Sequence, residues 1–130
     1  MDRIRFITHQ GKRILFIDLS HCSAEEVAAN SELVPSYVTS EPRNSVLILV
    51  DFTGSHMDRA ALEIIKKGMV FDRPHVKRSA WVGAESVPKA FVNALKTFSL
   101  RHLPAFDTHE EALSYLVAEN DQHQELAAPA

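Results

Sequence analysis

The chain has 130 residues, the length of one ordinary domain with a single hydrophobic core. Hydrophobic residues make up 45% of the sequence and charged residues 24%, values that exclude a disordered chain, a collagen-like repeat and a coiled-coil rod. The formal net charge of −3 argues against a dedicated nucleic-acid-binding protein, because affinity for nucleic acid comes largely from basic side chains that neutralise phosphates.

Two short runs rich in β-branched and aromatic residues open the chain. They occupy residues 4–7 and 13–18, and Gly11 lies between them. This pattern predicts a β-hairpin that leads into a sheet.

A helix is predicted after the hairpin. Ser23 and Glu26 have the spacing of a capping box, so the helix should begin near Ala24. Pro35 cannot donate a backbone hydrogen bond, and we therefore expect it to divide or kink this helix, which should end by Pro42.

Residues 45–51 are apolar on both faces, the pattern of a central strand in a sheet that is covered on two sides. A turn follows at Thr53 and Gly54. Apolar residues then step by three and four and predict an amphipathic helix that starts at Met57. The apolar positions of this helix are Met57, Ala60, Ala61, Ile64, Ile65 and Met69.

Residues 76–83 predict the next strand. Trp81 should point to the opposite face from Ala80 and Val82, because side chains alternate along a strand.

Three elements are predicted in the last third of the chain. Ser86 with Pro88 marks a helix start. Residues 103–106 contain proline and should form a short edge strand at most. Thr108 and Glu111 have the spacing of a second capping box, which should open the last helix.

The apolar periodicity ends after Ala118, so we expect residues 1–118 to form the domain and residues 119–130 to form a polar tail. The predicted order is β-β-α-β-α-β-α-β-α. Alternating strands and helices predict a single α/β domain with a mixed, mostly parallel sheet and about four to five helices.

Three stretches carry a resemblance to a known family. They are residues 50–54 (VDFTG), 73–83 (RPHVKRSAWVG) and 106–113 (FDTHEEAL). Together with the order of elements, they resemble the bacterial SpoIIAA-like family of the STAS superfamily of anti-sigma-factor antagonist domains, over about residues 4–117. The resemblance implies a STAS-type fold and a binding or regulatory module rather than an enzyme. The fold is also related to CRAL-TRIO-type lipid carriers, so the resemblance implies possible binding of an apolar small molecule.

The resemblance also concerns a phosphorylation switch. In regulatory STAS proteins the helix after the central strand opens with Phe-Met-Asp-Ser-Ser-Gly-Leu, and a kinase phosphorylates the first serine. Residues 56–62 read HMDRAAL here, and Arg59 replaces that serine with the charge opposite to a phosphate. The comparison implies that the switch is absent. Ser55 is a weak substitute, more simply explained as a helix cap.

We expect a partner protein or a small apolar or anionic ligand to bind near the start of this helix, because ligands of such sheets bind beyond the carboxyl ends of the strands. The candidate residues are Asp51, Thr53, Gly54, Ser55, Met57, Asp58 and Arg59. Apolar side chains could line a pocket there, although such residues usually pack the core. These side chains are Trp81, Phe91, Phe98, Met57 and Met69.

Basic side chains concentrate in one part of the sequence. They are Lys66, Lys67, Arg73, Lys77 and Arg78. Such a patch could attract phosphate, an anionic lipid headgroup or an acidic partner, but cations are also common at helix C-termini because the helix dipole favours them there.

A metal-assisted enzyme is an alternative hypothesis. Asp18, Asp51 and Asp107 all fall near predicted strand ends, where carboxylates could hold Mg²⁺ or act as acid and base. Aspartates also end strands because they form turns and caps, and this explanation is the simpler one. We therefore expect no catalytic residue, no metal site and no cofactor.

Cys22 is the only cysteine, so an internal disulfide is impossible and a cytoplasmic location is expected. It lies just before a predicted helix start, where a thiol can be activated, but a lone cysteine is more often a small buried apolar residue. The seven histidines lack zinc-binding spacing and are expected at the surface.

The longest unbroken apolar run covers residues 46–50, far less than the roughly 20 residues of a membrane span. We therefore expect no transmembrane segment, although peripheral contact with lipid is compatible with the basic residues. A purely structural homodimer, formed through an exposed helix face, is a further alternative.

Overall fold

The structure is a computed structural model that describes residues 2–100 and 102–118. The elements follow one another as β-β-α-α-β-α-β-α-β-α, with a short 3₁₀ turn, η1 (Ala84–Ser86), before the fourth helix. The predicted order is confirmed, with the first predicted helix divided in two. The predicted tail, residues 119–130, lies outside the described residues.

The chain begins with the predicted hairpin. Strands β1 (Ile4–His9) and β2 (Lys12–Asp18) pair antiparallel. Gln10 and Gly11 both have positive φ, at 52° and 81°. Such turns match the twist of the strands that they join.

The rest of the sheet is parallel. β3 (Val46–Asp51) pairs with β2 on one side and with β4 (Val76–Val82) on the other, and β5 (Ala105–Phe106) pairs with β4 at the edge. The strand order is therefore β1-β2-β3-β4-β5. Every residue of β3 is buried, as expected for a central strand covered on both faces.

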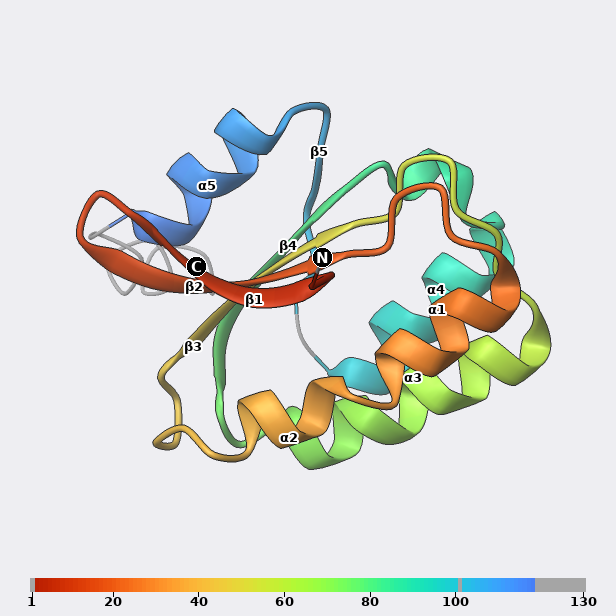
Figure 1. Ribbon diagram of the computed structural model, residues 1–130, viewed down its shortest axis with the longest axis horizontal. Helices are drawn as coiled ribbons and strands as arrows, with labels where there is room; N and C mark the ends of the chain where they lie inside the picture. The colour runs from red at the N-terminus through yellow and green to blue at the C-terminus, as the bar shows by residue number, and fades with distance from the viewer. Residues whose placement is uncertain (1, 101, 119–130) are drawn as a thin grey trace, which may run out of the picture.

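Two helical layers of unequal size cover the sheet (Figure 1). The larger layer consists of α1 (Ala24–Ser31), α2 (Val34–Val38), α3 (Arg59–Asp72) and α4 (Lys89–Ser99). The last helix, α5 (His109–Val117), lies on the other face of the sheet. The mixed, mostly parallel α/β fold predicted from the sequence is confirmed.

The side chains of the strands alternate between two cores. In β3, Ile48 and Val50 belong to the core beneath the large helical layer, whereas Leu49 belongs to the core beneath α5. In β4, Trp81 faces the large layer and Ala80 faces α5, as predicted.

The first capping box is confirmed. The Ser23 hydroxyl accepts a hydrogen bond from the Glu26 backbone, and the Glu26 carboxylate accepts one from the Ser23 backbone. Pro35 lies at the start of α2 and separates this helix from α1. At α5, the Thr108 hydroxyl accepts a hydrogen bond from the Glu111 backbone.

One predicted helix start was wrong in detail. The helix after β3 starts at Arg59 and not at Met57, and its cap is Asp58, whose carboxylate accepts a hydrogen bond from the Ala61 backbone at 2.8 Å. Ser55 is therefore not the cap. The start marked by Ser86 with Pro88 is that of α4, which begins at Lys89 directly after Pro88, while Ser86 ends the 3₁₀ turn η1.

Candidate functional site

The loops that follow β2, β3 and β4 lie together at the carboxyl edge of the sheet. The backbone N–H of His21 donates to the carbonyl of Thr53 at 2.8 Å. The backbone N–H of Gly54 donates to the Ser86 hydroxyl, also at 2.8 Å. These bonds join loops far apart in sequence, and we call this part of the molecule the loop edge.

Two glycines allow the close packing of the loop edge. Gly83 has a φ of +75°, and a Cβ there would lie 2.4 Å from the backbone nitrogen of Thr53. Gly54 has a φ of +68°, and a Cβ there would lie 2.4 Å from the His21 ring. Only glycine combines this backbone conformation with such close approach.

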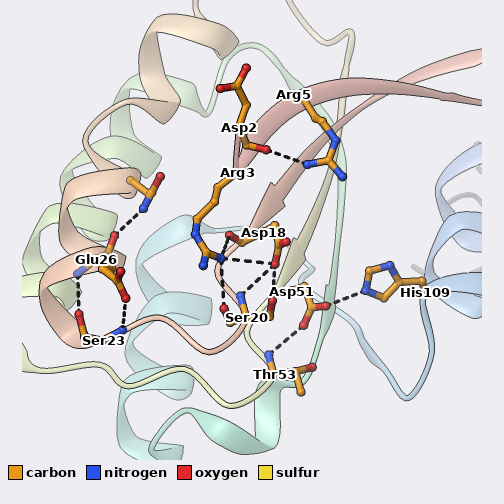
Figure 2. A network of polar contacts seen from close by, with 11 residues as sticks. Asp2, Arg3, Arg5, Asp18, Ser20, Ser23, Glu26, Asp51, Thr53 and His109 are labelled. Atoms are coloured by element: carbon orange, nitrogen blue, oxygen red, sulfur yellow. Dashed lines mark hydrogen bonds and ion pairs between the residues drawn. The ribbon is translucent and has the colours of Figure 1, made fainter.

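Asp51 joins the loop edge to α5. One of its carboxylate oxygens accepts a hydrogen bond from the Thr53 backbone at 2.8 Å, and the other lies 2.7 Å from His109 Nε2 (Figure 2). Burial disfavours the charged form of Asp51, but the hydrogen bonds from Thr53 and His109 outweigh it and hold the pKa below its ordinary value. Asp51 is therefore an ionised acceptor that is already paired on both sides.

The other strand-end aspartates have separate surroundings. Asp18 accepts hydrogen bonds from the Ser20 hydroxyl at 2.6 Å and from the Ser20 backbone, and Arg3 lies 3.9 Å away (Figure 2). Asp107 is exposed. Among residues 2–100 and 102–118, no three acidic, histidine or cysteine side chains lie close enough to hold a metal ion. The metal-assisted alternative gains no support from this geometry.

The predicted binding residues from 53 to 59 differ in accessibility. Thr53, Asp58 and Arg59 are exposed. Ser55 is only 4% exposed, and its hydroxyl has no hydrogen-bond partner in the part of the chain that the structure describes. Met57 is partly buried and packs against the core of the large helical layer.

Cys22 is a buried packing residue, as expected. It is fully inaccessible to solvent, and burial raises the pKa of its thiol. A raised pKa keeps the thiol protonated and is opposite to the shift that activates a cysteine nucleophile.

The predicted basic patch is divided between the two faces of the sheet. Arg78 donates hydrogen bonds to the carbonyls of Tyr115 and Ala118 at the end of α5. Lys66 and Arg73 belong to the large helical layer, where Lys66 lies 3.4 Å from a neighbouring carboxylate and Arg73 donates to a carbonyl at the end of α4. Arg78 is therefore engaged by α5, whereas Lys66 and Arg73 are engaged within the large helical layer.

A cavity of about 100 Å³ lies between the sheet and the large helical layer. We call it the inner cavity. Its lining is mainly apolar and comes from β2, β3, β4 and all four helices of that layer. The lining residues are Ile17, Leu19, Ser31, Val34, Ile48, Val50, Phe52, Ile65, Gly68, Met69, Asp72, Arg73, Val76, Ser79, Trp81, Ser99 and Leu103.

The inner cavity differs from the pocket expected from the sequence. Trp81 and Met69 line it, whereas Met57 and Phe91 pack elsewhere against the core and Phe98 is 36% exposed. None of the residues from 53 to 59 lines it. The part of α3 that lines the inner cavity is the second half of the helix and not its start.

Asp72 is the one acidic residue in the lining of the inner cavity. It is 8% exposed, and within the described residues its Oδ1 atom has no hydrogen-bond partner. Burial raises the pKa of its carboxyl to about 7, against the opposing influence of His75. Buried acids without partners are rare in proteins and common in functional sites.

The sequence-based interpretation missed two residues, Asp72 and His109. Asp72 had a detectable signal, since it follows Ile65 and Met69 at helical spacing and so continues the apolar face of α3. His109 had only a topological signal. It follows β5, whose carboxyl end lies at the same edge of the sheet as that of β3.

Comparison with solved structures identifies the fold. A STAS (anti-sigma-factor antagonist) domain protein from Planctomyces limnophilus is similar, with a TM-score of 0.58 and 17% sequence identity, over 88% of this chain and 98% of that chain. The chain therefore has a STAS-type fold, as the resemblance implied. No protein-family model and no curated protein matches the sequence.

Proposed function

We propose that the chain is a non-catalytic binding module of the STAS type that holds a small apolar ligand in the inner cavity. The observation that carries the proposal is the cavity itself, a space of about 100 Å³ bounded by Trp81, Phe52 and aliphatic side chains. A concave, mostly apolar space with a few polar groups is the usual form of a small-molecule site. The STAS-type fold supports a binding role, since such folds serve more often in regulation than in catalysis.

The size and apolar lining of the inner cavity suit a small hydrocarbon ligand. An engineered apolar cavity of about 150 Å³ in another protein stays dry and binds benzene. A ligand that fills the inner cavity would gain contacts with its apolar lining.

Phe52 offers a route from the inner cavity to the loop edge. Its ring lines the cavity and packs edge-on against Trp81, with 5.2 Å between ring centres. Its carbonyl accepts a hydrogen bond from the Ser55 backbone. A ligand that moves the Phe52 ring would therefore also act on the exposed loop at Thr53, where a partner protein could sense it.

The proposed module works without a phosphoserine switch. Arg59 is the first residue of α3, at the position that the resemblance assigns to the phosphorylated serine. Ser55 is a poor substitute because a kinase needs an exposed hydroxyl and Ser55 is buried.

We also propose a cytoplasmic location, which suits a chain with a single, unpaired cysteine. Among the described residues, no helix combines the length and the apolar character needed to cross a bilayer.

The test uses Trp81, the only tryptophan, as a reporter inside the cavity. Benzene is titrated while tryptophan fluorescence and the thermal midpoint are recorded. We expect a saturable fluorescence change and a higher midpoint, because a ligand that binds only the folded state stabilises it.

A cavity-filling variant provides the control. Ser79→Ile adds carbon atoms to the lining from β4 and should abolish the response, whereas Thr8→Ile introduces the same isoleucine side chain at an exposed position of β1 and should leave it intact. If benzene changes neither signal in the wild-type protein, the proposed function is wrong.

A partner protein or a second copy of the chain is the second candidate. Four large apolar side chains near the ends of α3 and α4 are exposed. They are Val70, Phe71, Phe98 and Leu100. Exposed apolar side chains of this size suit a protein interface when they are contiguous. Sedimentation velocity of the wild-type protein and of Phe71→Ser tests self-association, and a monomer at all concentrations would remove the homodimer.

A further inference from the structure

Asp72 occupies a position that packing alone does not explain. It is the last residue of α3, where the negative end of the helix dipole disfavours a carboxylate. It is also buried, and its Oδ1 atom accepts no hydrogen bond from the residues that the structure describes. An aliphatic residue here would avoid both costs.

Neither His75 nor Arg73 donates a hydrogen bond to the Oδ1 atom of Asp72. His75 influences Asp72 only through its charge, and its own ring nitrogen lies 2.8 Å from the carbonyl of Glu41. Arg73 directs one end of its guanidinium group to the carbonyl of Phe98, at 2.9 Å. An acceptor oxygen of Asp72 therefore remains available to whatever occupies the inner cavity.

Other polar groups gather around the same space. Of the six buried polar or charged residues in the described part of the chain, four line the inner cavity. They are Ser31, Asp72, Ser79 and Ser99. Polar groups that converge on an otherwise apolar cavity fix the orientation of a ligand and determine its chemical class.

We propose that the inner cavity binds a small organic cation, an apolar amine whose ammonium group donates a hydrogen bond to Asp72 while its hydrocarbon part contacts Trp81 and the aliphatic lining. This inference rests on the proposed function and specifies its ligand. A cation supplies both the hydrogen-bond donor and the opposite charge that would stabilise a buried carboxylate. Hydrogen bonds between oppositely charged groups are stronger than those between neutral groups. Arg73 also lines the cavity with a positive charge, but its guanidinium group already donates to the carbonyl of Phe98, whereas a carboxylate ligand would meet the like charge of Asp72. A neutral alcohol would supply the donor without the charge.

Three probes that share one branched hydrocarbon skeleton separate these cases. They are isobutylamine, isobutanol and isobutyrate, which are cationic, neutral and anionic at about pH 8, where the Asp72 carboxyl with its pKa of about 7 is mostly ionised. Isothermal titration calorimetry gives each dissociation constant, and the fluorescence of Trp81 reports occupancy of the cavity. We expect isobutylamine to bind at least about tenfold more tightly than isobutanol, and isobutyrate to bind most weakly.

Two variants test whether Asp72 causes this preference. Asp72→Asn keeps the shape of the side chain and removes its charge, so it should reduce the preference for the amine to less than about twofold while isobutanol still binds. Glu63→Gln removes a charge from the exposed side of the same helix and should leave the preference unchanged. Circular dichroism confirms that each variant is folded, and Asp72→Glu, which restores the charge, should retain a preference for the amine.

The outcomes distinguish this inference from the proposed function. If benzene and isobutanol bind but isobutylamine has no advantage, or if isobutyrate binds best, the inner cavity is a ligand site and the amine proposal is wrong. If Asp72→Asn retains the full preference for the amine, the carboxylate does not select the ligand and the inference is also overturned. If neither benzene nor any of the three probes binds, both proposals fail.

Discussion

His109 Nε2 lies 2.7 Å from Asp51 Oδ2 and links the first residue of α5 to the last residue of the central strand. The His109 ring also meets the ring of Phe16 edge-on, with 5.4 Å between their centres. Since α5 alone covers its face of the sheet among the described helices, this pair attaches the start of that layer to the carboxyl edge of the sheet.

Replacement of His109 should loosen α5. His109→Ala removes the hydrogen bond and the ring contact and leaves one oxygen of Asp51 without its partner, so we expect a loss of about 1 kcal/mol in the free energy of unfolding. Urea denaturation measures the loss, and hydrogen exchange should accelerate in α5 before it does in α3. His102→Ala, at another exposed histidine, serves as the control. Equal stability of the two variants would contradict the anchoring role.

The stability of the protein should fall as pH rises because of Asp72. The folded state raises the pKa of its carboxyl from 3.8 to about 7, so between these values the folded protein keeps a proton that the unfolded chain has lost. The stabilising contribution of Asp72 to the free energy of unfolding is therefore fully present below about pH 4. It decreases by about 1.4 kcal/mol for each pH unit above that, until the pH passes about 7.

Asp72→Asn isolates this effect. Relative to the wild-type protein, the variant should gain about 2 to 3 kcal/mol in the free energy of unfolding between about pH 5 and pH 8, because asparagine does not titrate. Urea denaturation at both pH values gives the difference. If the difference between Asp72→Asn and the wild-type protein does not change with pH, Asp72 titrates in its ordinary range and the prediction is wrong.

The close packing of the loop edge predicts that replacement of Gly83 strongly lowers the stability of the protein. In Gly83→Ala, the new methyl group would lie 2.4 Å from the backbone nitrogen of Thr53, so the loop must move. We expect a loss of more than about 2 kcal/mol. Gly11→Ala is the matched control, because Gly11 has a similar φ of +81° but no neighbouring atom within 4 Å, and it should lose only about 1 kcal/mol. If both variants lose a similar free energy of unfolding, the loss comes entirely from the positive φ and not from the contact with Thr53.

Local patterns predicted most of the fold because its determinants are local. The two-sided apolar run of β3, the capping box at Ser23 and the break at Pro35 each depend on residues within one turn or one strand. Ser86 has a contact that no local pattern reveals. Its hydroxyl accepts a hydrogen bond from the backbone of Gly54, 32 residues away.

The candidate site was harder to predict because tertiary contacts create it. Asp51 and His109 are 58 residues apart, and no local pattern relates them. The inner cavity draws its lining from seven elements and the chain around them, so single residues such as Ser79 or Ser99 give no signal of their role. Asp72 was the exception, since an acid on the apolar face of a helix is visible in the sequence.

Gly68 in the middle of α3 should reveal whether the inner cavity is retained for a ligand. Its position lines the cavity, and a Cβ there would meet only Pro35, with Cγ at 3.5 Å and Cδ at 4.0 Å, which are ordinary contacts. Gly68→Ala should therefore stabilise the protein by about 0.5 to 1 kcal/mol, because glycine is a poor residue for a helix interior. Thermal and urea denaturation measure this gain. If the ligand uses the space beside Gly68, the same variant should bind benzene more weakly, and the natural glycine then exchanges stability for binding. A stabilised variant with unchanged binding would place the ligand elsewhere in the cavity, and a destabilised variant would show that α3 and α2 pack too closely for the added methyl group.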